Sequence, residues 1–216
     1  MGFYEFGRLC CLIFVKFFFK IEVVGKSNID CELGSLILVS NHKSCFDPVF
    51  LGLGVKRQLF FMAKRELFLI PMLGFIIKKL GAFPVKRGSR DANAVVYAKS
   101  IINSGRILAL FPEGTRSKGD EILKFKSGAV RLAITNNCKI LPCSIFYSKG
   151  KFRRRVFLEF GKAITYRQLF EQKIDRVDLD NLSHKILVEL SVKLRELIVK
   201  MNNSQKEKLL IKTGNL

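Results

Sequence analysis

The chain has only two histidines, and one of them lies in a short polar stretch that also carries a carboxylate. This stretch, NHKSCFDP at residues 41–48, places Asp47 five positions after His42. An unperturbed imidazole titrates close to neutral pH, so His42 could take the proton of an alcohol that attacks an acyl carbon, while a nearby carboxylate fixes its tautomer. Asp47 followed by Pro48 is typical of a helix N-terminus, with Asp47 as the N-cap, which would hold the carboxylate rigidly. The spacing therefore fits a general base and its orienting acid.

Two other interpretations of this loop stay open on the residues alone. A histidine and an aspartate at one spacing arise easily by chance, and loop histidines are commonly only hydrogen-bonded, so this short match by itself favours a structural role. Cys45 could be the nucleophile instead, although a loop thiol beside the apolar Phe46 is more often inert.

A second polar loop, within GAFPVKRGSRD at residues 81–91, could bind an anion. Lys86 and Arg87 precede Ser89, a candidate N-cap for the next helix, so two cations and free backbone N–H groups would face one place. An ordinary basic turn explains the same residues equally well.

A third loop, FPEGTRS at residues 111–117, directly follows an apolar run. Arg116 could clasp a phosphate with two parallel hydrogen bonds, and Gly114 would let the backbone approach a ligand. Glu113 would then either lock Arg116 or accept a substrate hydroxyl. The alternative is an exposed turn with a Glu–Arg surface pair, which would contribute little to stability.

The elements that must position these loops alternate between short apolar runs and longer amphipathic ones, a pattern typical of an α/β domain. Strands are predicted at residues 35–40, 59–63, 82–85, 107–111, 140–146 and 155–160. Helices are predicted at residues 48–54, 65–79, 90–104, 126–137 and 180–203, and the tail from 202 is expected to fray. In a mostly parallel mixed sheet flanked by helices, the three polar loops would all emerge at the carboxyl edge, where open α/β sheets bind ligands.

The charge of the chain points to a polyanionic partner. Its 216 residues include 38 Lys and Arg against 18 Asp and Glu, a net charge of +20. No basic recognition helix, zinc spacing or aromatic–basic strand pattern indicates nucleic acid. Basic residues instead flank apolar runs, as in LIFVKFFFK (12–20) and LGFIIKKLG (73–81), which suits an anionic membrane surface. The six cysteines show no metal-ligand spacing, so neither a metal nor another cofactor is expected.

The N-terminal residues 1–20 are apolar but interrupted by charges, so we expect an amphipathic helix that lies in the membrane interface rather than crossing it, within a membrane-anchoring segment of residues 1–25. Lys16 and Lys20 would then reach the lipid headgroups. Packing of this helix on the protein's own core is an equally good interpretation. Residues 26–216 would form the second unit, a single α/β domain. We expect the protein on the cytoplasmic face of the cell membrane, as a peripheral or monotopic protein.

Taken together, the motifs resemble those of the glycerolipid acyltransferases, and most closely the bacterial lysophosphatidate acyltransferases. The family's ordered motifs NHxSxxD, GxxFxxR, FPEGTRS and a hydrophobic-Pro strand are found here as NHKSCFD (41–47), GAFPVKR (81–87), FPEGTRS (111–117) and ILPCSI (140–145). The resemblance covers residues from about 35 to 160. The fourth motif departs from the usual pattern, because Cys143 and Ser144 stand where an aliphatic residue or alanine is more common.

The resemblance implies a reaction and roles for matching residues. His42 would deprotonate the free hydroxyl of lysophosphatidate, with Asp47 orienting it, and the hydroxyl would attack an acyl thioester of acyl carrier protein or coenzyme A, giving phosphatidate without a metal. The residues implied in substrate binding are Lys64, Arg87, Glu113, Gly114, Thr115 and Arg116, with the cations as phosphate partners and Glu113 arranging the glycerol end. Glycerol 3-phosphate or another lysophospholipid is the alternative acceptor. From a different class, the chain could be a non-catalytic basic protein that binds membranes or nucleic acid. Segment 65–79 would suit an acyl-chain wall or a membrane-dipping surface, or else a core helix.

Overall fold

The sheet of this protein, seen in a computed structural model, contains six strands where the sequence predicts them and one more. The structure describes residues 2–86, 91–148, 153–169 and 184–213. The strands are β1 (Phe19–Val24), β2 (Leu36–Ser40), β3 (Leu59–Lys64), β4 (Ala82–Val85), β5 (Ile107–Leu110), β6 (Lys139–Ser148) and β7 (Arg154–Phe160). The helices are α1 (Phe3–Phe18), α2 (Ser27–Asp30), α3 (Asp47–Gly54), α4 (Pro71–Lys79), α5 (Ala92–Asn103), α6 (Gly128–Thr135), α7 (Tyr166–Leu169) and α8 (His184–Thr213), with the 3-10 turn η1 (Arg65–Leu69).

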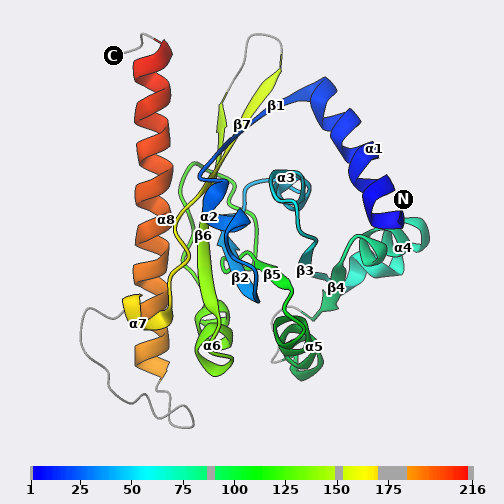
Figure 1. Ribbon diagram of the computed structural model, residues 1–216, viewed down its shortest axis with the longest axis vertical. Helices are drawn as coiled ribbons and strands as arrows, with labels where there is room; N and C mark the ends of the chain where they lie inside the picture. The colour runs from blue at the N-terminus through cyan, green and yellow to red at the C-terminus, as the bar shows by residue number, and fades with distance from the viewer. Residues whose placement is uncertain (1, 87–90, 149–152, 170–183, 214–216) are drawn as a thin grey trace.

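The strands form one seven-stranded sheet in the order β1-β7-β6-β2-β5-β3-β4 (Figure 1). Strands β6, β2, β5, β3 and β4 run parallel, and β7 pairs with β6 in the antiparallel direction. The mostly parallel mixed sheet is therefore confirmed. The ends of β2, β5 and β4 share one edge of the sheet, as expected for the three polar loops. Strands β2 and β5 are neighbours, so the first and third loops adjoin, whereas β4 lies at the far side of the sheet.

Each face of the sheet carries its own hydrophobic core. On one face, β2 contributes Ile37 and Val39, and the covering helices are α5, α6, α7 and α8. On the other face, β2 contributes Leu36 and Leu38, and α1, α2 and α3 cover it. All five residues of β2 are buried, as a continuous apolar run in a central parallel strand requires. The polar loop that follows β2 is thus carried by the most buried strand of the fold.

The N-terminal segment, predicted as a helix over residues 1–20, is a helix followed by a strand. Helix α1 ends at Phe18, and β1 begins at the next residue and pairs with β7 in parallel. β-branched residues in Phe19–Val24 favour a strand, and β7 offers an open edge. Helix α1 buries only Val15. No helix in the described part of the chain is both long and apolar enough to span a bilayer.

Two other predictions are corrected. The segment 65–79 divides at Pro71, because proline lacks an N–H and disfavours helical geometry in the residue before it. It forms η1 and then α4. The tail does not fray at 202: α8 continues to Thr213, and Asn202 donates to Ser144 Oγ at 2.9 Å and to the Ile145 carbonyl at 3.1 Å. A side chain within the segment expected to fray therefore holds the helix on β6.

Candidate active site

The imidazole of His42 and the carboxylate of Asp47 are in direct contact. His42 Nδ1 lies 2.7 Å from Asp47 Oδ2. Because a carboxylate only accepts hydrogen bonds, this contact places the ring proton on Nδ1 and leaves Nε2 with a free lone pair. Among the described residues, none is recorded as a hydrogen-bond partner of Nε2, and the His42 side chain keeps 12% of its surface exposed. This is the arrangement that a general base and its orienting acid require.

The Asp47 carboxylate is held by the loop that precedes it. Its side chain has 0% exposure, and Oδ2 also accepts the backbone N–H groups of Lys43 at 2.7 Å and Ser44 at 2.8 Å. The N-cap of α3 is Phe46 and Asp47 is its first residue, so the helix begins at residue 47, one residue earlier than predicted. The Asp47 carboxylate therefore caps the turn before the helix rather than the helix itself. Tyr147, at the end of β6, donates its hydroxyl hydrogen to the other oxygen, Oδ1.

Asn41 fixes the start of this loop. Its side-chain oxygen accepts the N–H of Ile145 at 2.8 Å, and its side-chain nitrogen donates to the Ile145 carbonyl at 2.9 Å. These two bonds extend the pairing of β2 with β6 by one more step after the backbone ladder ends at Ser40 and Cys143. Since Asn41 is fully buried, the direction in which the chain leaves β2 is set before it reaches His42.

A phenylalanine from the third loop supports the face of the His42 ring. The ring of Phe111 stacks on the imidazole at 4.1 Å between centroids and 17° between planes. Phe61 of β3 stacks in turn on Phe111. With the edge bound to Asp47 and one face covered by Phe111, the imidazole has little freedom to rotate.

Glu113, in the third loop, supports the loop that carries His42. Its side chain is 4% exposed, and its two oxygens accept the backbone N–H groups of His42 at 2.7 Å and Leu123 at 3.0 Å. Burial raises the pKa of Glu113, although the two N–H groups act in the opposite direction. The alternative interpretation of this loop, an exposed Glu113–Arg116 surface pair, is therefore not what the structure contains.

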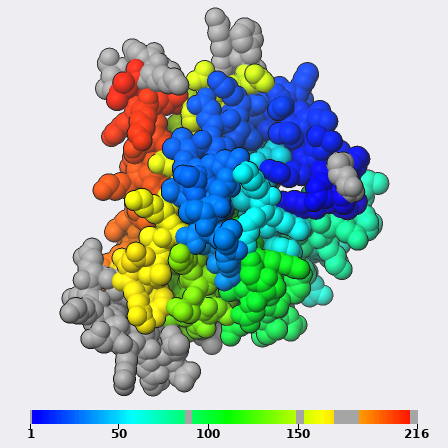
Figure 2. Space-filling model, in the orientation of Figure 1, coloured from blue at the N-terminus to red at the C-terminus, as the bar shows by residue number. Residues whose placement is uncertain are grey.

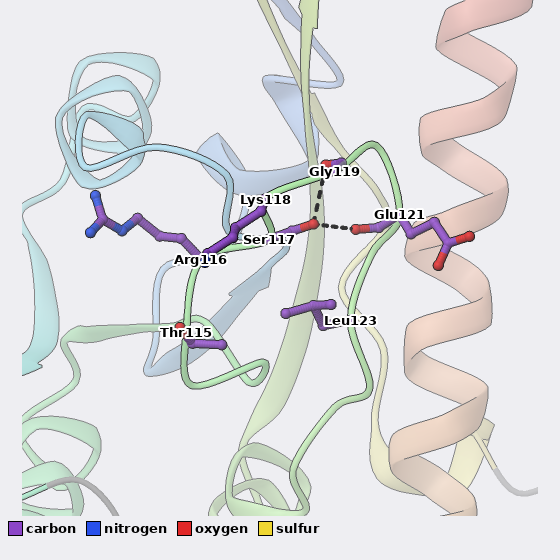
Figure 3. Close-up of a pocket in the computed structure, with 7 residues that line it drawn as sticks. All are labelled: Thr115, Arg116, Ser117, Lys118, Gly119, Glu121 and Leu123. Carbon is purple, nitrogen blue, oxygen red and sulfur yellow. Dashed lines mark hydrogen bonds between the residues drawn. The ribbon is translucent and has the colours of Figure 1, made fainter.

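The third loop also brings Arg116 beside the first loop. The backbone N–H of Ser117 donates to the His42 carbonyl at 2.8 Å, so residue 116 adjoins the candidate base. Arg116 is exposed, and in Figure 3 its side chain extends away from the Ser117–Glu121 part of the loop. A hollow of about 470 Å³ opens here, lined by Thr115, Arg116, Ser117, Lys118, Gly119, Glu121 and Leu123.

Gly114 and Thr115 connect the buried Glu113 to the exposed Arg116. Gly114 has φ of +71°, a conformation that favours glycine. Thr115 is exposed and lines the hollow. The left-handed turn at Gly114 is what lets Glu113 face inward and Arg116 outward within a few residues.

The remaining predicted residues lie farther along the edge or outside the described residues. Lys64 ends β3, is exposed and lies 3.5 Å from Glu66. Arg87 and Ser89 fall outside the described residues. The cap of α5 is Asp91, whose side chain accepts the N–H of Ala94 at 3.1 Å, so the helix begins at Ala92 rather than at residue 90. Hydrogen bonds from backbone N–H groups, first that of Lys86, lower the pKa of Asp91.

Three residues of the site were not predicted from the sequence: Tyr147, Phe111 and Asn41. Phe111 and Asn41 stand inside motifs but read as the end of a strand and a polar loop residue, and Tyr147 lies 100 positions from its partner Asp47. The unusual fourth-motif residues are both buried. Ser144 accepts a hydrogen bond from Asn202, and burial raises the pKa of Cys143.

A mostly parallel α/β sheet that carries the half-buried His42 bonded to the buried Asp47 at its carboxyl edge, with the Arg116 loop beside them, is an arrangement suited to a group-transfer enzyme. Comparison with known families agrees. A sequence model of the acyltransferase family matches residues 20–146. The chain belongs to the acyltransferase family.

Several of its relatives share one name. The chain is 27% identical over 180 residues to the 1-acyl-sn-glycerol-3-phosphate acyltransferase of Borreliella burgdorferi, covering 81% of this chain and 72% of that one. It is 30% identical over 167 residues to the protein of the same name from Helicobacter pylori, covering 76% and 68%. In fold it is similar to the 1-acyl-sn-glycerophosphate (LPA) acyltransferase of Thermotoga maritima, with a TM-score of 0.67 and 23% identity over 94% of this chain and 78% of that one.

Proposed function

We propose that this protein transfers a fatty acyl group from an acyl thioester to the free hydroxyl of lysophosphatidate, giving phosphatidate. The observation that carries this proposal is the contact of 2.7 Å between His42 Nδ1 and Asp47 Oδ2, beside the loop of Arg116. Within the described part of the chain, Nε2 has no recorded hydrogen-bond partner. The names of the curated relatives support lysophosphatidate as the acceptor. The donor is acyl carrier protein or coenzyme A, both of which are acidic or phosphorylated and complement a chain of net charge +20.

In the proposed reaction, His42 Nε2 accepts the proton of the acceptor hydroxyl as its oxygen attacks the thioester carbonyl. The new C–O ester bond forms, the C–S bond breaks, and the proton passes from the imidazolium to the departing thiolate. The Asp47 carboxylate stabilises the transient imidazolium and keeps Nε2 aimed at the acceptor. General base catalysis of this kind typically contributes about 10²–10⁴-fold in rate.

The acceptor phosphate would bind to the cations at the carboxyl edge. Arg116 is the best placed of them, because it is exposed and its neighbour Ser117 is bonded to His42. Lys64 ends a strand at the same edge, and Arg87 completes the proposed set from outside the described residues. Thr115 and the glycine turn at Gly114 would line the approach of the phosphate to Arg116.

Glu113 would serve this reaction through His42 rather than through the glycerol end of the acceptor, the role that the resemblance suggests. Both of its oxygens are engaged with backbone N–H groups, and the side chain is buried. Because the carboxylate is buried behind these contacts, a substrate hydroxyl has little access to it. Its proposed role is to hold the backbone of His42 against the third loop.

The reaction would take place at a membrane, on its cytoplasmic face, with α1 lying in the interface. Helix α1 leaves large apolar side chains exposed, among them Phe17 at 76%, and α4 does the same with Met72 at 78%. The rings of Phe3 and Phe75 meet at 5.8 Å, so the two helices share one side of the molecule (Figure 2). Contiguous exposed apolar surface of this kind marks an interaction site, and basic flanks suit anionic lipid.

The proposal is tested with purified protein, lysophosphatidate and an acyl thioester in anionic vesicles. His42→Ala should lose turnover by at least about 10²-fold while remaining folded, and His184→Ala, which changes the other histidine, is the matched control. Retained turnover in a folded His42→Ala protein would refute the base assignment. Presenting glycerol 3-phosphate and lysophosphatidylcholine in competition identifies the acceptor, and wild-type protein inactive with every acceptor would favour a non-catalytic membrane-binding protein.

A further inference from the structure

Tyr147 contacts the one Asp47 oxygen that does not serve His42. Oδ2 accepts hydrogen bonds from the His42 ring and from two backbone N–H groups. Oδ1 accepts the hydroxyl hydrogen of Tyr147, and within the described residues no other donor to Oδ1 is recorded. The carboxylate is thus gripped at both ends, at one end by its own loop and at the other by a strand 100 positions away.

The register of the sheet places Tyr147 at this point. Ser40 pairs with Cys143, and the Asn41 side chain bonds to Ile145. Tyr147 comes two residues after Ile145 and therefore points to the same face of the sheet. Strand β6 extends beyond the end of β2, so it passes beside the loop that follows β2. The ring of Phe50, in α3, meets the Tyr147 ring at 6.1 Å and 64°, which fixes the direction of the hydroxyl.

The hydroxyl of Tyr147 stays a donor over the whole working pH range. Burial, and then the Asp47 carboxylate, raise the pKa of Tyr147 above its usual value. The phenol is therefore neutral wherever a lipid-modifying enzyme would operate. Asp47 in turn is fully buried, and a buried carboxylate oxygen without a partner is costly.

We propose that Tyr147 is a positioning residue, which holds the plane of the Asp47 carboxylate so that Oδ2 stays in line with the Nδ1–H of His42. This inference rests on the proposed function, since it assigns a role within that reaction. Without the phenol hydroxyl, only the bonds at Oδ2 oppose rotation of the carboxylate about its Cβ–Cγ bond, and the imidazole is held less rigidly. Small errors in the position of a base have large effects on rate, because the reacting atoms must approach within a narrow range of geometry.

The test is Tyr147→Phe, which keeps the ring and its contact with Phe50 and removes only the hydroxyl. We expect kcat to fall about 10- to 100-fold, the range for losing a hydrogen bond to a charged group, with the KM for lysophosphatidate nearly unchanged. The matched control is Tyr97→Phe, a tyrosine of α5 that packs on Phe83 and should behave as wild type.

A second measurement does not depend on turnover. The ring Nδ1–H of a histidine bonded to a carboxylate gives a proton NMR resonance far downfield, and this chain has only two histidines to assign. In Tyr147→Phe the His42 resonance should shift or broaden, and in Tyr97→Phe it should not. A purely structural role predicts a lower melting temperature with kcat and the resonance unchanged, and that result would overturn the inference. Failure of the proposed function itself would be recognised separately, because turnover would then survive in the His42→Ala protein.

Discussion

The backbone N–H of His42 donates to Glu113 Oε1 at 2.7 Å. Glu113 belongs to the loop after β5, and His42 to the loop after β2, so this bond joins two motifs across neighbouring strands of the sheet. The Ser117 N–H closes a second link, to the His42 carbonyl. The candidate base is therefore fixed through its main chain by the loop that also carries Arg116.

This relationship predicts the effect of Glu113→Gln. A glutamine offers only one oxygen, so its amide nitrogen would face a backbone N–H and one of the two bonds would be lost. We expect a loss of about 1–3 kcal/mol in the free energy of unfolding, and kcat lowered about tenfold with little change in the KM for lysophosphatidate. Urea unfolding and steady-state kinetics measure the two. Glu121→Gln, an exposed carboxylate of the same loop, is the control. A raised KM for lysophosphatidate with unchanged kcat would instead indicate that Glu113 binds the acceptor.

Arg116→Ala should weaken binding of the acceptor selectively. Arg116 is exposed beside the His42 loop, and losing a charge-assisted bond to phosphate costs about 1.5–3 kcal/mol. The KM for lysophosphatidate should therefore rise roughly 10- to 100-fold, with a much smaller change for the acyl donor. Lys118→Ala, which removes an exposed cation two residues away, should change neither by more than a few fold. Equal effects on donor and acceptor would contradict an acceptor clamp.

Phe17→Asp should reduce binding of the protein to anionic vesicles. Phe17 of α1 is 76% exposed, and burial of a phenylalanine in an apolar phase is worth about 1.5–3 kcal/mol. We expect at least a roughly tenfold weaker partition in vesicle sedimentation, with turnover retained on detergent-dispersed substrate. Leu33→Asp is the control, since Leu33 is 88% exposed but lies after α2. If both variants sediment with vesicles as wild type does, α1 is not the membrane contact.

Asn41→Ala should destabilise the fold and not only the site. The change leaves the buried N–H of Ile145 without its recorded partner, and an unsatisfied buried donor costs about 1–3 kcal/mol. Urea unfolding should show this loss as a lower midpoint with an unchanged slope. Asn103→Ala, at an exposed position of α5, should stay within about 0.5 kcal/mol of wild type. A midpoint equal to that of wild type would show that the Asn41 bonds carry no net stability.

Much of the fold could be predicted from the sequence because its strongest signals are local. The apolar runs of β2 and β5 are continuous, as strands covered on both faces must be, and the polar stretches after them mark the edge of the sheet where ligands bind. The pairing of His42 with Asp47 could also be anticipated, since both lie on one short loop. The resemblance to a known family rested on these same local stretches.

Elements whose partners are distant in sequence were predicted less well. Strand β1 was not predicted, because Phe19–Val24 becomes a strand only where the edge of β7 is available to it. The end of α8 was expected to fray, yet Asn202 finds its acceptors on β6. In both cases the local pattern was ambiguous, and tertiary contacts supplied the energy that selected one structure.

The sequence by itself therefore determined the class of fold, the edge of the sheet where the polar loops lie, and the pairing of His42 with Asp47. Only the tertiary structure decided what holds them: Glu113 facing inward to the main chain of His42, and Tyr147 reaching Asp47 from β6. The physical reason is that a hydrogen bond between segments 71 or 100 positions apart depends on strand order and register, and these leave no periodic trace in the residues themselves.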